Sequence, residues 1–143
     1  MKIKAFQGGF DKNFSYLIWC TKTKYAAIID PAVSINPILE TINKHNLLLD
    51  KILITHTHHD HIFYLDDFKY LFPAIEIICS NITKNEIINF KGVVHKEIIS
   101  IGEEFIVCLH TPGHLYNSMC YWNKRRKLLF TGDTMFVGRS GRT

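Results

Sequence analysis

Residues 56–61, HTHHDH, contain four histidines and one aspartate in six consecutive positions, directly after an apolar run. On a loop at the end of a strand, alternate side chains point to one place, so His56 and His58 can share a metal ion. Asp60 and His61 lie one step further on and can turn towards a second ion. Imidazole nitrogens and a carboxylate suit zinc, iron or manganese. The segment therefore predicts a metal site.

Two later segments supply side chains of the same kinds. Residues 110–114 (HTPGH) follow a strand-like run, and their proline and glycine predict a sharp bend that presents His114. Residues 131–133 (TGD) follow another apolar run, so we expect Asp133 on a loop at a strand end. A carboxylate there can bridge two metal ions or complete a one-metal site. His110 lies in the strand before the bend, and we expect it to be structural.

Strand-like and helix-like runs alternate along the chain. The strands and helices that they predict must bring the three segments together in the fold. Asn36 followed by Pro37 predicts a helix start, and the helix is expected to run to about Asn46. Many strands with interspersed helices predict a layered α/β or α+β sandwich. Further helices are expected at 62–71 and, shorter, at 83–89, and strands at 3–6, 15–20, 25–29, 51–55, 75–79, 97–100, 104–110, 118–122 and 127–131.

Composition limits the classes of protein. The 143 residues fit one domain, 1–143, and 47% of them are hydrophobic. No apolar run reaches the roughly 18 residues of a membrane-spanning helix, and the N-terminus does not look like a signal peptide, so we expect no membrane partner and a cytoplasmic location. The net charge is +4. Its densest source, Lys124–Lys127, predicts a hairpin tip rather than a nucleic-acid patch, and no nucleic-acid partner is expected.

Four cysteines are far apart in the sequence and never form a CxxC pair. Each has apolar or β-branched neighbours, which is typical of buried, reduced thiols in strands. A cysteine zinc site is not expected at these spacings. The four are Cys20, Cys79, Cys108 and Cys120.

In their order along the chain, the HTHHDH, TPGH and TGD segments resemble the metallo-β-lactamase superfamily. Within it the chain resembles the glyoxalase II-like branch, the hydroxyacylglutathione hydrolases and their small relatives. Asp30-Pro31, Ser118 after the TPGH turn, TGDTMF at 131–136 and GRSGRT at 138–143 match that branch. The resemblance covers essentially the whole chain. It implies an αββα sandwich with the metals at one edge of the two sheets.

The resemblance also implies six metal ligands, divided between two ions. The first ion takes His56, His58 and His114, the second takes Asp60 and His61, and Asp133 bridges the two. His59 occupies a variable position of the motif and is not expected to be a ligand.

The chain departs from the family pattern at two places. The second metal of the family gains a further histidine from a loop beyond the GRT segment, whereas this sequence ends at Thr143. We therefore expect a C-terminally truncated sequence and an incomplete sandwich. Residues 62–64 (IFY) stand where the family often has small residues, which narrows the expected pocket mouth.

The main functional hypothesis is a metal-dependent hydrolase with one or two zinc ions. Zinc lowers the pKa of a water, which attacks the carbonyl carbon of a thioester such as an acylglutathione. Asp60 is the expected catalytic residue, because it can orient this water and accept its proton. The expected partner is thus a small-molecule substrate.

Two alternatives remain open. A sister branch, the glutathione persulfide dioxygenases, binds one iron through two histidines and an aspartate, and the matching residues here are His56, His114 and Asp133. Such a site leaves coordination positions open for oxygen and substrate. The other alternative is an inactive fragment of such an enzyme. Iron and manganese therefore stay possible beside zinc.

Overall fold

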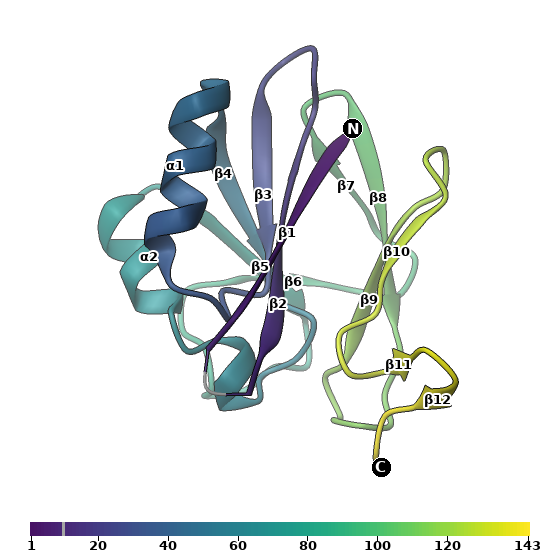
Figure 1. Ribbon diagram of the computed structural model, residues 1–143. Helices are drawn as coiled ribbons and strands as arrows, with labels where there is room; N and C mark the ends of the chain where they lie inside the picture. Colours follow the sequence, from purple (N-terminus) through teal and green to yellow (C-terminus); the bar gives the residue numbers. More distant parts are fainter. Residues whose placement is uncertain (10) are drawn as a thin grey trace.

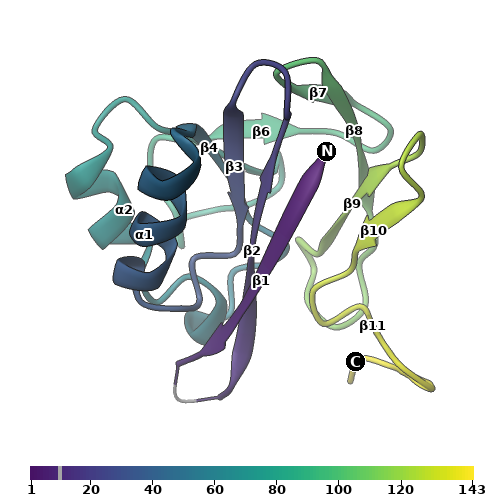
Figure 2. The same ribbon diagram turned by 45° about the horizontal axis from the view of Figure 1, so that its top comes forward.

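Two packed β-sheets and a layer of helices make up the computed structural model, which describes residues 1–9 and 11–143. Helices α1 (Ile35–His45) and α2 (Leu65–Leu71) lie on one face of the larger sheet, and the smaller sheet packs on its other face (Figures 1 and 2). The predicted class, a layered α/β sandwich with two sheets, is confirmed.

The larger sheet has six strands in the order β1-β2-β3-β4-β5-β6. Its first three strands pair antiparallel, and β3 to β6 pair parallel. Parallel neighbours need a crossover connection, and α1 and α2 supply it between β3, β4 and β5. The strands are β1 (Lys2–Gly8), β2 (Asn13–Trp19), β3 (Tyr25–Ile29), β4 (Leu48–Leu53), β5 (Glu76–Ser80) and β6 (Lys91–Val93).

The smaller sheet is an antiparallel meander in the order β10-β9-β8-β7. Its strands are β7 (Ile98–Ile101), β8 (Glu104–His110), β9 (Met119–Asn123) and β10 (Leu128–Phe130), and a short pair, β11 (Met135–Phe136) and β12 (Arg139–Ser140), follows. Asn123 stands opposite Leu128, so Lys124–Lys127 form the tip of the β9–β10 hairpin, as the sequence predicts.

Alternate side chains of the larger sheet pack into two separate hydrophobic cores, one on each face. Leu17 faces the helices together with Ile38 and Phe68. Its neighbour Ile18 faces the smaller sheet together with Tyr121. Successive side chains of a strand point to opposite faces, and both faces of this sheet are covered. Its strands are therefore continuous apolar runs in the sequence.

Helix α1 begins earlier, and helix α2 later, than the sequence predicts. α1 begins at Ile35 with Ser34 as its N-cap, so Pro37 is its third residue instead of its first. A proline is still tolerated there, because the N–H groups of the first turn have no partner within the helix. α2 begins at Leu65 instead of residue 62, because a 3₁₀ turn, η1 (His59–His61), precedes it.

The helix predicted at 83–89 is wrong, and the strand β6 that follows was not predicted. Thr83 and Ile87, four residues apart, are both buried, so the spacing of the buried residues fits a helix face, yet the backbone is not helical. Asn89 has a φ of 58°, a left-handed conformation that ends any helix. The segment forms turns instead.

The burial of the cysteines agrees with the expectation from the sequence. All four cysteines are free and buried. No helix within residues 1–9 and 11–143 is long and apolar enough to cross a membrane. Both longer helices lie on the larger sheet, so apolar side chains on the outer face of the smaller one face solvent; Ile98 is 62% and Phe105 64% exposed.

Candidate metal centre

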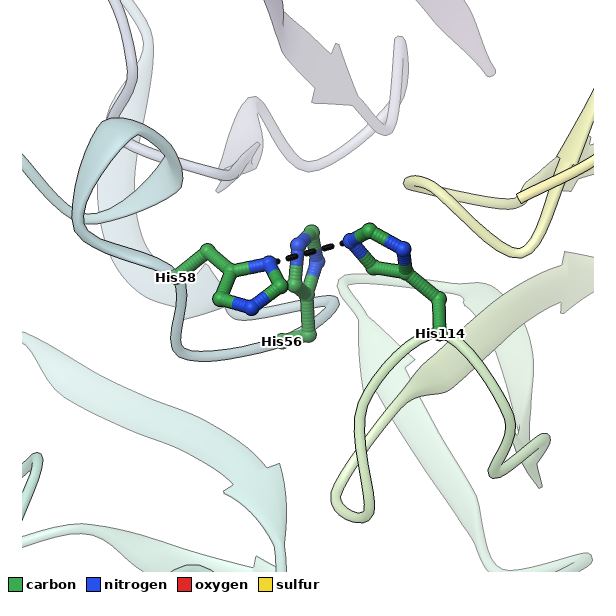
Figure 3. A group of neighbouring side chains, drawn as sticks. All are labelled: His56, His58 and His114. Carbon is green, nitrogen blue, oxygen red and sulfur yellow. Dashed lines mark hydrogen bonds between the residues drawn. The ribbon is translucent and has the colours of Figure 1, made fainter. Parts of the chain in front are cut away.

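The three motif segments meet at one edge of the two sheets. The loop after β4 carries His56 and His58, the β8–β9 loop carries His114, and the loop after β10 carries Asp133. The β8–β9 loop is closed by a hydrogen bond from Thr111 N to the carbonyl oxygen of Ser118, at 2.9 Å. This closure gives the tight bend that the sequence predicts. Figure 3 shows the three histidines pointing towards one another from two loops.

The rings of His56, His58 and His114 form a compact group. One nitrogen of each lies within 4.8 Å of the other two. Nε2 of His114 lies 3.0 Å from Nδ1 of His58, the contact that Figure 3 marks. Three imidazoles at this spacing are the set that a tetrahedral metal site uses, with a fourth position left open.

Asp133 lies between this group and His61. Its Oδ2 atom is 3.4 Å from Nε2 of His114 and 4.0 Å from Nε2 of His56. Its Oδ1 atom is 3.2 Å from Nε2 of His61. The carboxylate thus has one oxygen on each side, which is the position that a bridging ligand needs.

Asp60 completes the six predicted residues. Its Oδ2 atom lies 3.7 Å from Nε2 of His61 and accepts a 2.6 Å hydrogen bond from the side-chain amide of Asn13. His59 is exposed and its ring packs edge-on against Phe63, with the centroids 5.2 Å apart. The structure therefore gathers the six predicted residues and leaves His59 outside the group.

Three of the histidines use Nδ1 for a protein contact and turn Nε2 towards the group. Nδ1 of His61 lies 2.8 Å from Asp30 Oδ2, and Nδ1 of His56 lies 3.1 Å from the Thr55 hydroxyl. Nδ1 of His114 lies 2.9 Å from the carbonyl oxygen of Arg142. Metal-binding histidines use their second nitrogen in this way, which fixes the tautomer and the ring orientation.

Asp30 is the centre of the network behind the histidines. It is 3% exposed and adopts a φ of 55° at the end of β3, a conformation that aspartate tolerates. Its Oδ1 atom accepts from Thr55 N at 2.7 Å, and its Oδ2 atom accepts from the Thr55 hydroxyl at 2.6 Å. Asp30, His56 and His61 are also close enough to form a metal site. Since the oxygens of Asp30 are already engaged, we assign it the role of orienting His61.

Charge is unevenly distributed among these side chains. Burial, then the charge of His61, lowers the pKa of His56 to about 4, so His56 is neutral at pH 7. Burial would lower the pKa of His61, but Asp133 and Asp30 outweigh it and raise the pKa. Burial would raise the pKa of Asp133, but His61 outweighs it and the pKa falls. Without a metal, His61 is therefore the cation that balances Asp133.

The donor set fits a divalent cation. Within residues 1–9 and 11–143, Nε2 of His56 and Nε2 of His61 are buried ring nitrogens without a hydrogen-bond partner. Nε2 of His61 approaches Asp133 but lacks the alignment of a hydrogen bond. An unpaired buried polar atom such as Nε2 of His56 costs free energy, about 1–3 kcal/mol, and a metal ion would remove this cost. It would also replace the proton on His61 as the partner of the carboxylates.

An open pocket of about 630 Å³ adjoins the cluster. Its lining includes His61 and Asp133 of the cluster and the aromatic residues Tyr16 and Phe130. The two rings contact each other, with centroids 5.2 Å apart. The volume is in the range of small-molecule sites.

His110, which the sequence predicts to be structural, has structural contacts here. His110 donates its backbone N–H to His95, and its ring nitrogen lies 3.0 Å from the carbonyl oxygen of Tyr116. Three residues that contact the site, Asn13, Asp30 and Thr55, were not predicted as site residues. Asn13 and Asp30 carry no signal in the sequence for this role, because only the fold places Asp60 and His61 next to them.

Comparisons with known proteins agree with this geometry. A family model described as the metallo-beta-lactamase superfamily matches residues 8–143. A protein of Schizosaccharomyces pombe named "probable hydroxyacylglutathione hydrolase glo2" is 36% identical, over 94% of this chain and 53% of its own length. The chain thus spans about half the length of the curated relatives that it matches.

Solved structures extend the comparison to the fold. ETHE1 from Myxococcus xanthus superposes with a TM-score of 0.88 and 26% identity, covering 100% of this chain and 62% of that protein. A metallo-beta-lactamase from Staphylococcus aureus superposes with a TM-score of 0.83 and 29% identity, covering 99% of this chain and 46% of that protein.

Proposed function

The chain belongs to the metallo-β-lactamase superfamily, and from this we propose that it is a metal-dependent hydrolase of thioesters such as acylglutathiones. The observation that carries the proposal is the group of His56, His58 and His114 with Asp133 beside it. The names of the curated relatives, hydroxyacylglutathione hydrolases, supply the substrate class. Four buried free cysteines fit the reducing, cytoplasmic compartment that we expect.

Zinc is the metal that we propose, in one or two ions. His56, His58 and His114 would hold the first ion, Asp60 and His61 the second, and Asp133 would bridge them. A bound zinc supplies a water of lowered pKa and polarises the carbonyl group that is attacked.

The side chains of this chain have distinct roles in such a reaction. Burial would raise the pKa of Asp60, but the hydrogen bond from Asn13 and the charge of His61 outweigh it, so its pKa is below the ordinary value. Asp60 is therefore ionised at neutral pH, and its carboxylate can orient the attacking water and accept its proton. Asp30 and the carbonyl group of Arg142 hold His61 and His114 in place.

Thiol release from a panel of acylglutathiones and simple thioesters tests the proposal. The protein is loaded with zinc, its metal content is measured, and the thiol is detected with a chromogenic reagent. We expect hydrolysis to fall at least about 100-fold in His56→Ala and His114→Ala, because each removes a metal ligand. His59→Ala changes the same loop outside the group and should retain activity. A zinc-loaded protein that releases no thiol from any member of the panel contradicts the proposal.

A persulfide dioxygenase is the second candidate, and one observation favours it. His56 Nε2 and His114 Nε2 lie 4.0 and 3.4 Å from the same Asp133 oxygen, so these residues also match a site of two histidines and one carboxylate. Metal analysis of protein purified without added metal separates the two candidates. One iron per chain, with oxygen uptake on addition of a persulfide, favours the dioxygenase, and zinc favours the hydrolase.

A further inference from the structure

The end of the first hairpin contacts the candidate metal centre through the side chain of Asn13. Asn13 is the first residue of β2 and stands opposite Gly8, the last residue of β1. Its side-chain amide donates to Oδ2 of Asp60 at 2.6 Å, across 47 positions of sequence. The hairpin carries none of the six predicted ligands, so this contact gives it a role that the ligand set does not explain.

The hydrogen bond restricts the carboxylate of Asp60. Asp60 lies in the short η1 turn, and its side chain is 23% exposed, so packing alone does not fix its orientation. The Asn13 amide holds Oδ2, and the same oxygen lies 3.7 Å from Nε2 of His61. A carboxylate oxygen has two lone pairs and can accept one hydrogen bond while it binds a cation. The contact thus fixes Asp60 in the orientation in which it and His61 face each other.

We propose that Asn13 is a positioning residue for the second metal site, which holds Asp60 ready to bind zinc jointly with His61. The inference rests on the proposed function, because it assumes that the cluster binds zinc. Carboxylate ligands in metal sites are themselves hydrogen-bonded, and loss of such a partner typically weakens metal binding by about 10–100-fold. The donor must be neutral or cationic, since a carboxylate at residue 13 would repel Asp60.

Zinc affinity is the quantity that tests this role. Competition with a chromophoric chelator is measured for the wild type, Asn13→Leu and Asn13→Asp, and Asp60→Asn defines the part of zinc binding that depends on Asp60. We expect that part to weaken about 10–100-fold in Asn13→Leu and more in Asn13→Asp. The visible spectrum of the cobalt-substituted protein should change in the same variants, because the coordination of the ion changes.

The matched control lies in the same hairpin. Gln7 donates its side-chain amide to the carbonyl oxygen of Lys12 at 3.2 Å and is exposed. Gln7→Leu removes a hairpin hydrogen bond without touching Asp60, so its zinc affinity should equal that of the wild type. Circular dichroism of every variant checks that the chain is folded.

A double variant decides whether Asn13 acts through Asp60. In the Asp60→Asn background, Asn13→Leu should cause no further loss of zinc affinity. The inference is overturned if Asn13→Leu binds zinc as tightly as the wild type, if the double variant loses further affinity, or if Asp60→Asn does not change zinc binding. Each of these outcomes leaves the hydrolase proposal standing. A wild-type protein that binds no zinc overturns both.

Discussion

At the scale of single residues, the candidate site includes polar groups behind the proposed ligands that hold those ligands in place. Asp30 accepts hydrogen bonds from Thr55 and contacts His61, and both partners belong to the loop after β4. A buried carboxylate in such a network stabilises the fold and sets the direction of an imidazole at the same time. Its replacement should therefore affect stability and metal binding together.

The substitution Asp30→Asn tests this dual role. Asparagine also tolerates the left-handed conformation at residue 30, so the change isolates the charge and the acceptors. One hydrogen-bond partner is left facing an amide N–H, and we expect the free energy of unfolding to fall by about 1–3 kcal/mol. Zinc affinity should fall about 10–100-fold. Denaturant titration and chelator competition measure the two effects.

Thr55→Val is the companion variant for Asp30→Asn. It removes the hydroxyl hydrogen bond to Asp30 and the contact of the hydroxyl with Nδ1 of His56, but keeps the backbone hydrogen bond and the contact between Asp30 and His61, so its effect on stability should be smaller. If Asp30→Asn binds zinc as the wild type does, the orienting role that we assign to Asp30 is wrong.

At the scale of elements, the loops that follow β4 and β10 touch directly. Gly132 has a φ of 51°, and a Cβ atom at this position would come within 2.4 Å of the Thr55 hydroxyl oxygen. Thr55 in turn is bonded to Asp30. The close approach of the two loops brings Asp133 to the histidines, so a glycine is needed there for space as well as for conformation.

Gly132→Ala should push the two loops apart. We expect it to destabilise the protein by more than about 1–2 kcal/mol, which is the conformational cost alone, and to weaken zinc binding. Gly138→Ala is the control: its φ is 79°, and nothing lies within 4 Å of the added Cβ atom. It should lose stability through the backbone only and keep its zinc affinity. Equal zinc affinities in the two variants would contradict the steric explanation.

At the scale of the whole molecule, an ion cluster remote from the site joins the two sheets. Glu104, at the start of β8, is 5% exposed and receives a 2.7 Å hydrogen bond from Arg126 in the β9–β10 hairpin. It also accepts from Asn123 at 3.2 Å and from the amino group of Met1 at 2.8 Å. Arg126, then these further donors, hold the pKa of Glu104 at about 2 in the folded protein.

This cluster makes stability depend on pH in a defined direction. Because the folded pKa is lower than the ordinary value of 4.5, the contribution of Glu104 is present above pH 4.5 and is lost as the pH falls towards 2. Glu104→Gln should lower the free energy of unfolding at pH 7 by about 1.5–3 kcal/mol. The difference from the wild type should shrink between pH 4.5 and 2. Denaturant titrations at several pH values measure it.

The neighbouring residue provides the control for Glu104. The side chain of Glu103 is 61% exposed and pairs at 3.4 Å with that of Lys22, which is 78% exposed. Glu103→Gln should therefore change stability by at most about 1 kcal/mol. A Glu104→Gln variant as stable as Glu103→Gln at pH 7 would show that the cluster does not stabilise the fold.

The sequence alone determines which metal-binding residue types the protein has and where they lie along the chain. The motif segments contain histidine and aspartate, and the apolar runs before them predict that these residues lie on loops at strand ends. These are local properties, carried by a few neighbouring residues. They suffice for a layered α/β or α+β class, the buried cysteines and the β9–β10 hairpin tip, whereas the two-sheet sandwich and the set of six candidate ligands are what the resemblance to the superfamily implies.

The tertiary structure decides how these parts work together. The hydrogen bond between Asn13 and Asp60 spans 47 positions, and the contact between His61 and Asp30 spans 31. No local pattern encodes such pairs, because they exist only when separate strands end side by side. The same reason explains the missed strand β6, which forms by parallel pairing with β5, whereas residues 83–89 form turns instead of the predicted helix.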